Sequence, residues 1–504
     1  MIRIISICLW LCWTNVINAQ LVTFSKVFSN FPLNPENGII IKETNDGYLL
    51  LSFSACLDNG SAECCALAKL DNYGNVAWFK QYPFHQGSNT LIVHNDLIYV
   101  AGHTNEPNSQ YTLYCIDSIG EVVWNKTYGD PSKNSEFPRL ALWGNKFVLC
   151  GVQDRNINNR PAPLLYFVIT DLSGSQLNEF YYGDENESTL SRKIFIDTEG
   201  NFLVSFVYCP TSCFLDLKAG VAAFNIAGNF IWELDLPFSY FTAGCYHAQT
   251  DSNTIAVKWY VDNTNMPNYD LTPPAIYFSD LYGNVSDTVI FKNQTLKDIN
   301  DIEPVWKHGL IGCGGEYPDY LNQPSQQLFG WLFRMNENLE VLWERSYIDS
   351  SYQGRTTFGL FNIIPTSDGG YMATGTIRNL MTGVLESHNW LLKLDSLGCL
   401  KPGCGNINYI TDTEDVVFLK GIDLKIFPNP ASNYIQVEFP NDFSINDVTM
   451  HLISNEGKTI RQFNVYSNQQ SLSLSGISYG TYYILISRRN EIIGSKQVII
   501  LNKQ

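Results

Sequence analysis

The chain has 504 residues, of which 45% are hydrophobic, 13% aromatic and 16% charged, and its formal net charge is -17. Low charge content, many aromatic side chains, 36 glycines and 21 prolines favour a protein of strands and turns, and they exclude disorder for most of the chain. Because an acidic surface repels phosphate backbones, this charge also excludes nucleic acid as a partner.

The first 19 residues have the pattern of a secretory signal peptide. One basic residue, Arg3, precedes an apolar run from Ile4 to Trp13, and the small residue Ala19 stands before Gln20. The run is too short to cross a bilayer, which takes about 20 apolar residues, and no later stretch is that long. We therefore expect an exported chain without a transmembrane segment.

Of the 13 cysteines, two lie in the expected signal peptide, which leaves eleven that would meet an oxidising compartment. An odd count leaves at least one thiol unpaired within the chain. The candidate local disulfides are Cys209 with Cys213, Cys399 with Cys404, and Cys64 or Cys65 with Cys56.

A repeated phrase dominates the residues up to 404. It is an apolar run ending in Asp or Asn, then two residues, a Gly, an apolar pair and an aromatic residue. The seven anchors are Asp71, Asp117, Asp171, Asn225, Asp280, Asn336 and Asp395, spaced 46 to 59 residues apart. The glycines are Gly74, Gly120, Gly174, Gly228, Gly283 and Gly398, and the Asn336 copy has Leu339 instead. A period of this length is typical of a propeller or a solenoid.

Each copy of the phrase predicts a hairpin, because Asp or Asn opens a turn with its own side chain and Gly accepts a positive φ. Another pair of strand-like runs precedes the phrase, for example at residues 96–104, 145–153, 200–208 and 369–377. Each period thus holds four short strands, the content of one propeller blade. We expect the repeated aromatic residues to fill the interfaces between blades.

The seventh phrase breaks off after Gly398 and lacks its outer strand. A matching segment stands at residues 21–28, where Phe24 and Phe28 have the four-residue spacing of Trp78 and Tyr82. Closing the ring with this segment would remove exposed sheet edges. We therefore predict an all-β chain in which residues 20–404 form a seven-bladed β-propeller closed by its N-terminal strand.

Residues 405–422 are polar and acidic, lack the phrase and indicate a linker. Residues 423–504 alternate strand-like runs with turn clusters, which predicts an immunoglobulin-like β-sandwich. Pro428 and Pro430 cannot donate to a ladder, so they mark a corner between strands.

This last segment resembles the type A C-terminal sorting domain of type IX secretion, found in Bacteroidota. The residues that carry the resemblance are Phe427, Pro428, Asn429, Pro430, Asn433, Gly457, Gly480, Tyr482 and Lys496. The resemblance implies that outer-membrane secretion machinery recognises residues 423–504, that the propeller is the cargo, and that the protein is secreted or attached to the cell surface.

The sequence predicts no catalytic, cofactor-binding or metal site. The histidines lack zinc spacing, and the G-x-S-x-G around Ser478 precedes a strand where a nucleophile elbow needs a helix. We expect a binding or structural module whose glycan or protein ligand meets loops at one mouth of the ring. The longest insertions, expected on one face, are residues 105–111, 154–164, 263–274, 317–327 and 379–389.

The alternative is a secreted propeller enzyme. A glycan hydrolase would need paired carboxylates, for which Glu316, Asp319 and Asp349 are candidates. A quinoprotein-like oxidoreductase is the other possibility, because the adjacent Cys64 and Cys65 are similar to the vicinal cysteines of those propellers. The sequence has no D-x-D-x-D-G calcium loop, which weighs against the second reading.

Overall fold

The computed structural model describes the chain in ranges, and within them every regular element is a β-strand. The described residues are 22–29, 40–56, 63–104, 108–154, 156–157, 160–161, 163–184, 187–210, 218–236, 246–250, 254–260, 274–291, 295–305, 308–317, 328–352, 356–379, 386–411, 413–417, 424–440, 443–454, 459–488 and 491–501.

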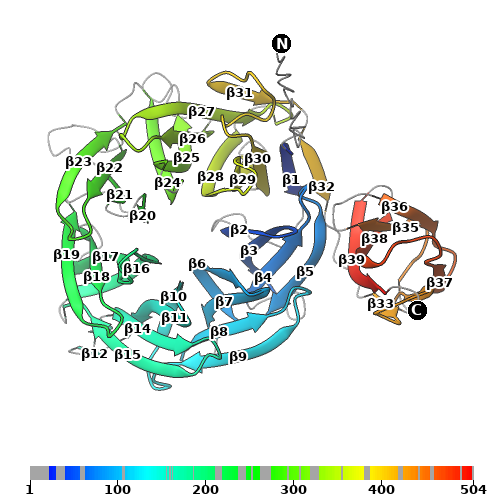
Figure 1. The fold of residues 1–504 in the computed structure, drawn as a ribbon, viewed down its shortest axis with the longest axis horizontal. Coiled ribbons are helices and arrows are strands. Elements are labelled where there is room, and N and C mark those ends of the chain that lie inside the picture. Colours follow the sequence, from blue (N-terminus) through cyan, green and yellow to red (C-terminus); the bar gives the residue numbers. More distant parts are fainter. Residues whose placement is uncertain are drawn as a thin grey trace, which may run out of the picture.

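Seven antiparallel sheets built from these residues stand around a common centre, as the blades of a ring (Figure 1). The first blade contains β2 (Ile40–Thr44), β3 (Gly47–Ala55), β4 (Glu63–Leu70) and β5 (Val76–Tyr82). The second contains β6 (His85–His94), β7 (Leu97–His103), β8 (Tyr111–Ile116) and β9 (Val122–Tyr128). The third contains β10 (Ser135–Trp143), β11 (Lys146–Gln153), β14 (Leu164–Asp171) and β15 (Gln176–Tyr182), and the short pair β12 (Asn156–Ile157) and β13 (Arg160–Pro161) lies between β11 and β14.

The other four blades continue in chain order. The fourth contains β16 (Glu187–Ile196), β17 (Phe202–Pro210), β18 (Lys218–Phe224) and β19 (Phe230–Leu236). The fifth contains β20 (Tyr246–Gln249), β21 (Ile255–Tyr260), β22 (Pro274–Ser279) and β23 (Val285–Ile290). The sixth contains β24 (Leu296–Pro304), β25 (Leu310–Tyr317), β26 (Phe329–Met335) and β27 (Val341–Asp349). The seventh contains β28 (Thr356–Pro365), β29 (Tyr371–Asn379), β30 (Glu386–Leu394) and β1 (Phe24–Ser29). The predicted propeller class is confirmed.

The anchor turns join the third and fourth strands of the first six blades, and the seventh follows the third strand of the last blade. In the first blade, Asp71 Oδ1 accepts hydrogen bonds from the backbone N–H of Tyr73 and of Asn75, each at 2.8 Å. Gly74 follows with φ +75°, and its N–H donates to Asp71 O at 3.1 Å. In the one copy without glycine, Leu339 adopts the same left-handed conformation at φ +65°. The turn therefore tolerates a side chain here, and Leu339 packs against the hydrophobic cluster shared by the fifth and sixth blades.

The repeated aromatic residues join neighbouring blades by packing on the glycine of the next anchor turn. A Cβ atom added to Gly174 would lie 2.7 Å from the ring of Trp124, and Tyr128 donates its hydroxyl hydrogen to Gly174 O at 2.8 Å. The same close approach recurs around the ring, with Trp78 on Gly120, Phe180 on Gly228, Trp232 on Gly283, Trp343 on Gly398 and Phe24 on Gly74.

We expect Gly174→Ala to lower the free energy of unfolding by about 2–4 kcal/mol, because it combines a left-handed backbone with a clash against Trp124. Gly369→Ala is the matched control, since Gly369 has φ +84° and no atom within 4 Å of the added Cβ. It should cost about 1–2 kcal/mol, the backbone part alone. Urea unfolding followed by tryptophan fluorescence measures both variants. Equal losses of stability would show that the contact between Trp124 and Gly174 contributes nothing.

The N-terminal strand β1 closes the ring by pairing antiparallel with β30, so that Val27 lies opposite Trp390 and Phe24 opposite Lys393. Trp390 also donates its indole N–H to Ser25 Oγ at 3.1 Å. The outer strand missing from the seventh phrase therefore comes from the other end of the propeller sequence.

Residues 405–422 differ from the plain linker that the sequence predicts. β31 (Ile407–Ile410) pairs parallel with β27, and β32 (Glu414–Val417) pairs parallel with β1, so both add a fifth strand to a blade. Lys26 forms an ion pair with Glu414 at 2.8 Å across the second junction. Each strand has only four residues and follows no repeat phrase, which explains why the sequence pattern does not reveal them, although Ile410 packs into the core of the sixth and seventh blades.

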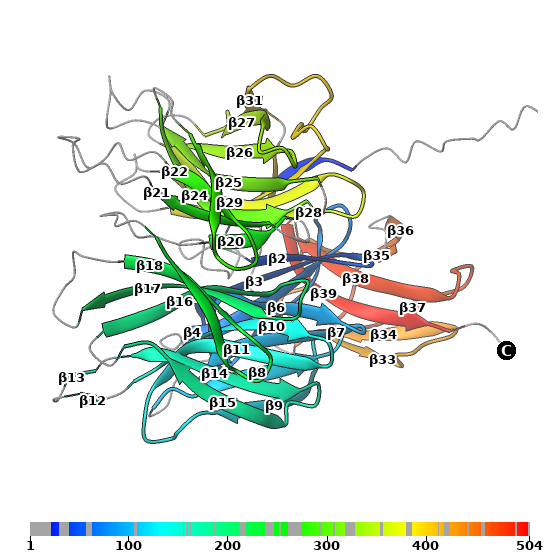
Figure 2. The same cartoon turned by 60° about the vertical axis from the view of Figure 1, so that its left-hand side comes forward.

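Residues from 424 onward form a separate unit of two sheets, which we call the sorting unit. One sheet contains β33 (Lys425–Phe427), β34 (Tyr434–Glu438) and β37 (Gln469–Ser473), and the other contains β36 (Thr459–Asn464), β35 (Val448–Ser454), β38 (Gly480–Arg488) and β39 (Glu491–Ile500). Alternate side chains of both sheets share one core, with Ile435, Val437, Met450, Leu452 and Ile484 among its members. The unit lies beside the first blade (Figure 1, Figure 2).

Two disulfides are present among the described residues, Cys56–Cys64 and Cys399–Cys404. The structure thus settles the alternatives around Cys56, and Cys65 is a buried free thiol. Cys213 lies outside the described residues, so the expected pairing with Cys209 stays a prediction. The described part of the chain holds no helix long and apolar enough to span a membrane.

Candidate functional site

The expected sorting residues Phe427 to Pro430 form a corner that is tied to the last strand of the sorting unit. Asn429 Nδ2 donates to Gln497 O at 2.9 Å, and Asn429 Oδ1 accepts from the N–H of Ile499 at 2.8 Å. The N–H of Ala431 donates to Ile499 O at 2.8 Å. Because one side chain satisfies both a donor and an acceptor of β39, an asparagine suits this position better than other small polar residues.

The other expected sorting residues have separate structural roles. Asn433 O accepts from the N–H of Leu474 at 2.9 Å, which fixes the start of β34 against β37. Gly480 begins β38 at φ +151°, and Tyr482 packs into the shared core. Lys496 is exposed on β39, and Gly457 lies outside the described residues.

A charged residue of the sorting unit affects the pKa of a residue in the propeller. A hydrogen bond from Lys80 holds the pKa of Glu121 below its usual value, and the positive charge of Lys496 on the sorting unit adds to this effect. The two units are therefore close enough to interact electrostatically.

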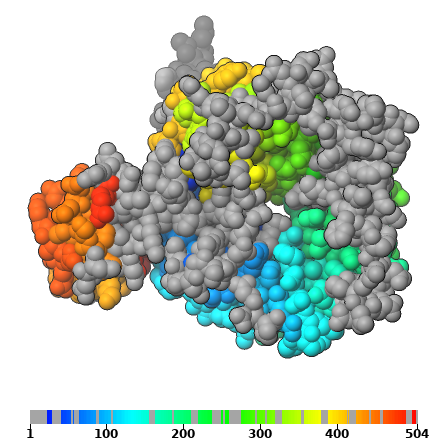
Figure 3. Space-filling view, turned by 180° about the vertical axis from the view of Figure 1, so that it is seen from behind, coloured from blue at the N-terminus to red at the C-terminus, as the bar shows by residue number. Residues whose placement is uncertain are grey.

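The centre of the ring is lined by the first strand of each blade (Figure 1), and Figure 3 shows this centre from the opposite side. Within the described residues, five of these inner strands have a bulge, in β6, β10, β16, β24 and β28. A bulge re-aims a side chain and often stands next to a functional site. The bulged residues include Phe137, Arg192, Asn300 and Phe361.

At the bulge, the backbone of the inner strand comes close to the second strand of the same blade. In four blades the second strand has a glycine at this point. A Cβ added to Gly314 would lie 1.8 Å from Asp298 O, and one added to Gly375 would lie 1.9 Å from Gly359 O. Gly102 and Gly151 have the same close contact. The sequence shows these glycines, but their position at the ring centre depends on the pairing of the strands and is not evident from the sequence.

Phe137 has the least usual backbone of these bulged residues. Its φ is +53°, it precedes Pro138, and its side chain is 37% exposed. Both the left-handed conformation and the following proline disfavour this arrangement. The ring lies edge-on to that of His103, with centroids 5.2 Å apart, and His103 stacks on His85 at 4.8 Å.

These residues stand at the face from which the expected insertions leave. His103 ends β7 and His85 begins β6, directly opposite each other. Burial, and then the neighbouring His85, lower the pKa of His103 to about 3, so this imidazole is neutral. A neutral ring can accept a hydrogen bond, as His103 Nδ1 does from the N–H of Phe137 at 3.4 Å.

A charged network crosses the ring centre further along the inner strands. Lys193 Nζ donates to Glu303 Oε1 at 2.7 Å and to Asp301 Oδ1 at 3.3 Å, which links the fourth blade to the sixth. Asp301 Oδ2 accepts from Asn362 Nδ2 at 2.6 Å, which adds the seventh blade. Lys193 is 8% and Asp301 4% exposed, so the pair is almost wholly removed from water.

The pKa values in this network reflect burial and charge. Burial raises the pKa of Asp301 to about 6, more than Lys193 lowers it. For Glu303, Lys193 and Lys42 together outweigh burial and hold its pKa below the usual value. Burial alone would lower the pKa of Lys193, but Asp301 and Glu303 raise it, so this amine stays charged.

A carboxyl pair on β19 forms a second polar group. Tyr182 donates to Glu233, and Tyr208 donates to Asp235 Oδ1 at 3.0 Å. Burial first, and then the charge of Asp235, raise the pKa of Glu233.

Two of the three carboxylates that the sequence offered for glycoside chemistry, Glu316 and Asp349, accept hydrogen bonds from neighbouring residues. Glu316 accepts from Thr295 at 2.9 Å and from Ser346 at 2.5 Å. Asp349 accepts from the N–H of Ser351 at 2.9 Å, and Asp319 lies outside the described residues.

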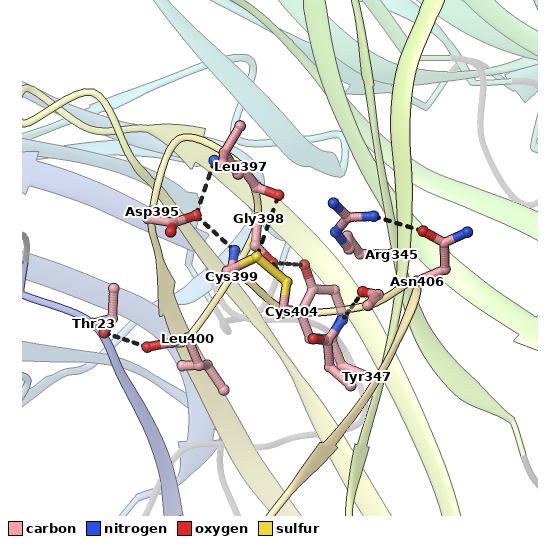
Figure 4. Close-up of a disulfide and its surroundings, with 12 residues drawn as sticks. Thr23, Arg345, Tyr347, Asp395, Leu397, Gly398, Cys399, Leu400, Cys404 and Asn406 are labelled. Carbon is pink, nitrogen blue, oxygen red and sulfur yellow. Dashed lines mark hydrogen bonds between the residues drawn. A yellow bond between two sulfur atoms is a disulfide. The ribbon is translucent and has the colours of Figure 1, made fainter. Parts of the chain in front are cut away.

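The Cys399–Cys404 disulfide secures the point where the seventh blade leads into β31 (Figure 4). Asp395 Oδ1 accepts from the N–H of Cys399 at 2.8 Å, and Tyr347 donates to Gly398 O at 2.6 Å. Thr23 donates to Leu400 O at 2.7 Å. The disulfide therefore lies where the sixth blade, the seventh anchor turn and the N-terminal segment meet.

The five expected insertions connect the second strand to the third in their blades, so they leave from the same end of each sheet. Most of their residues lie outside the described part of the chain. Their gathering on one face at the ring's mouth is still a prediction for their side chains.

Comparison with known proteins bears on the sorting unit. The family model for the secretion system C-terminal sorting domain matches residues 425–501. This match confirms that the chain carries a type IX C-terminal sorting domain, so the protein is exported to the cell surface or secreted. No curated protein matches the chain.

Solved structures with a similar chain path are distant. A polysaccharide lyase described as an ulvan lyase has 10% identity and a TM-score of 0.43, over 75% of this chain and 97% of its own. The β-propeller domain of the Trilobed protease from Pyrococcus furiosus has 9% identity and a TM-score of 0.40, over 75% of this chain and 99% of its own. Likenesses this weak carry no information about activity.

Proposed function

We propose that the protein is an extracellular binding module, in which the sorting unit directs export and the propeller binds a ligand at the mouth of the ring from which the long insertions leave. The observation that carries the proposal is Phe137, a partly exposed aromatic residue held in a strained conformation on an inner strand. Strain of this kind is retained where it positions a side chain for a task.

The surroundings of Phe137 favour a carbohydrate ligand. An exposed phenyl ring offers an apolar face of the size of a sugar ring, and the imidazoles of His85 and His103 beside it have ring nitrogens that can form hydrogen bonds with hydroxyl groups. The acidic net charge of the chain disfavours a polyanionic ligand. The sorting unit stands at the side of the disc, so it leaves this mouth accessible (Figure 2).

A glycan array with the purified full-length protein, followed by titration calorimetry on the best ligand, tests the proposal. Phe137→Ala should weaken binding about tenfold, since one stacked ring contributes on the order of 1 kcal/mol or more. Phe230→Ala is the matched control, because Phe230 is 51% exposed on the outer strand β19. Equal affinities for both variants and the unchanged protein would contradict the proposal.

The enzyme alternative has one observation in its favour, the raised pKa of Glu233 beside Asp235. A carboxyl group whose pKa is raised by burial and by a neighbouring carboxyl group is the kind of residue that can act as a general acid. New reducing ends released from a bound glycan during incubation would favour the hydrolase over the binding module.

A further inference from the structure

The two outer faces of the sorting unit differ in what covers them. On the outer side of the four-stranded sheet, Ile453, Tyr483 and Leu485 are each at most 9% exposed. They belong to one hydrophobic cluster with Trp78 and other residues of the first two blades. Their neighbours along the strands, such as Ile484, point the other way into the shared core. This sheet is therefore sandwiched between its own core and the propeller.

The other blades provide an internal control for this contact. The outer strands of the first, second, fourth and sixth blades begin with an apolar pair, and in the second blade Val122 and Val123 are 42% and 55% exposed. In the first blade the equivalent Val76 and Ala77 are 2% and 3% exposed. Val76 packs within the propeller core, whereas Ala77 belongs to the cluster that contains Ile453, Tyr483 and Leu485 of the sorting unit, whose strand β39 contacts β5. The sorting unit therefore covers the side of β5 on which Ala77 lies.

The outer face of the three-stranded sheet has the opposite character. Phe427 and Tyr434 are 42% and 54% exposed, although their strand neighbours Ile426 and Ile435 point into the shared core. Lys425 lies opposite Glu438 in the register, so the charges of this face balance. Exposed aromatic residues on a face without net charge favour binding to another protein. Binding to an anionic lipid surface would instead need clustered Lys and Arg residues.

We propose that this face, formed by β33, β34 and β37 around Phe427 and Tyr434, is the surface that the secretion machinery contacts, and that its partner there is an apolar protein surface. The opposite face is occupied by the propeller in the folded chain. The bonds of Asn429 to β39 hold β33 in place before any partner arrives, which lowers the entropy that binding must overcome. The inference rests on the export role of the sorting unit.

The test uses the full-length chain in a host with a functional type IX system. Tyr434→Ser should reduce the ratio of external to periplasmic protein at least fivefold, with the thermal midpoint of the purified protein unchanged. Tyr409→Ser is the matched control, because Tyr409 is 67% exposed on β31 in the propeller. Leu485→Ser alters the docked face, and should speed hydrogen exchange in β5 while external protein stays within about twofold of the unchanged chain.

Two results would overturn the inference: export of Tyr434→Ser at the unchanged level, or retention of Leu485→Ser as strong as that of Tyr434→Ser. If residues 424–504 did not direct export at all, the chain that lacks them would also leave the cell. Testing that truncated chain therefore distinguishes failure of the export role from failure of this inference. Ligand binding by the propeller is not measured in this assay, so its failure cannot be confused with either outcome.

Discussion

Deleting residues 424–504 should retain the protein in the periplasm, with external protein reduced at least tenfold. The sorting unit carries the match to secretion-system sorting domains, and it has a core of its own. The cut spares β31 and β32, so the ion pair of Glu414 with Lys26 still holds the closing strand. Cell fractionation with an antibody against the propeller measures the distribution.

The truncated propeller should still fold, which separates loss of export from loss of structure. All tryptophans beyond the expected signal peptide lie between residues 78 and 390, so their fluorescence reports on the propeller alone. Because Trp78 shares a cluster with residues of the sorting unit, a small shift to longer wavelength is expected, while the other tryptophans should keep the emission that they have in the full chain. Truncated protein outside the cell would contradict the prediction, and unfolded protein in the periplasm would show that the sorting unit also stabilises the ring.

The features that the sequence predicts are those with a local cause repeated in every blade. Asp71 and Gly74 define a turn within five residues, and the aromatic spacing of Phe24 and Phe28 matches that of other outer strands. Such signals depend on neighbours in sequence, and seven copies make them visible. The pairing of β1 with β30 agrees with this spacing.

The features that the sequence does not predict depend on residues far apart. The contact of Lys193 with Asp301 joins residues 108 positions apart, and the inner strands that carry them have no repeated charge pattern. β31 and β32 have only four residues each and pair with strands that lie far away in the sequence, so no local pattern marks them. The choice of Cys64 over Cys65 was also open, since it depends on which face of β4 meets Cys56.

Replacing Lys193 with methionine should lower the free energy of unfolding of the propeller by about 3 kcal/mol or more. The substitution keeps the length of the side chain but leaves Asp301 and Glu303 in the ring centre without their cation, and removing one partner of a buried ion pair typically costs about 3–5 kcal/mol. We expect the lower end because the side chain of Glu303 is 20% exposed. Urea unfolding followed by tryptophan fluorescence measures the loss.

Lys133→Met is the matched control, since Lys133 pairs with Asp130 at the surface, where both side chains are more than 40% exposed. Solvent screens such a pair, so the midpoint should not move.

The loss of stability caused by Lys193→Met should also be smaller at pH 4 than at pH 7. Asp301, whose pKa burial raises to about 6, takes up a proton first and no longer needs the cation. Glu303 has a lowered pKa, so its contribution to stability is present at neutral pH and disappears only as the pH falls through that value. A loss that is equal at both pH values would mean that packing of the Lys193 stem, and not its charge, holds the fourth and sixth blades together.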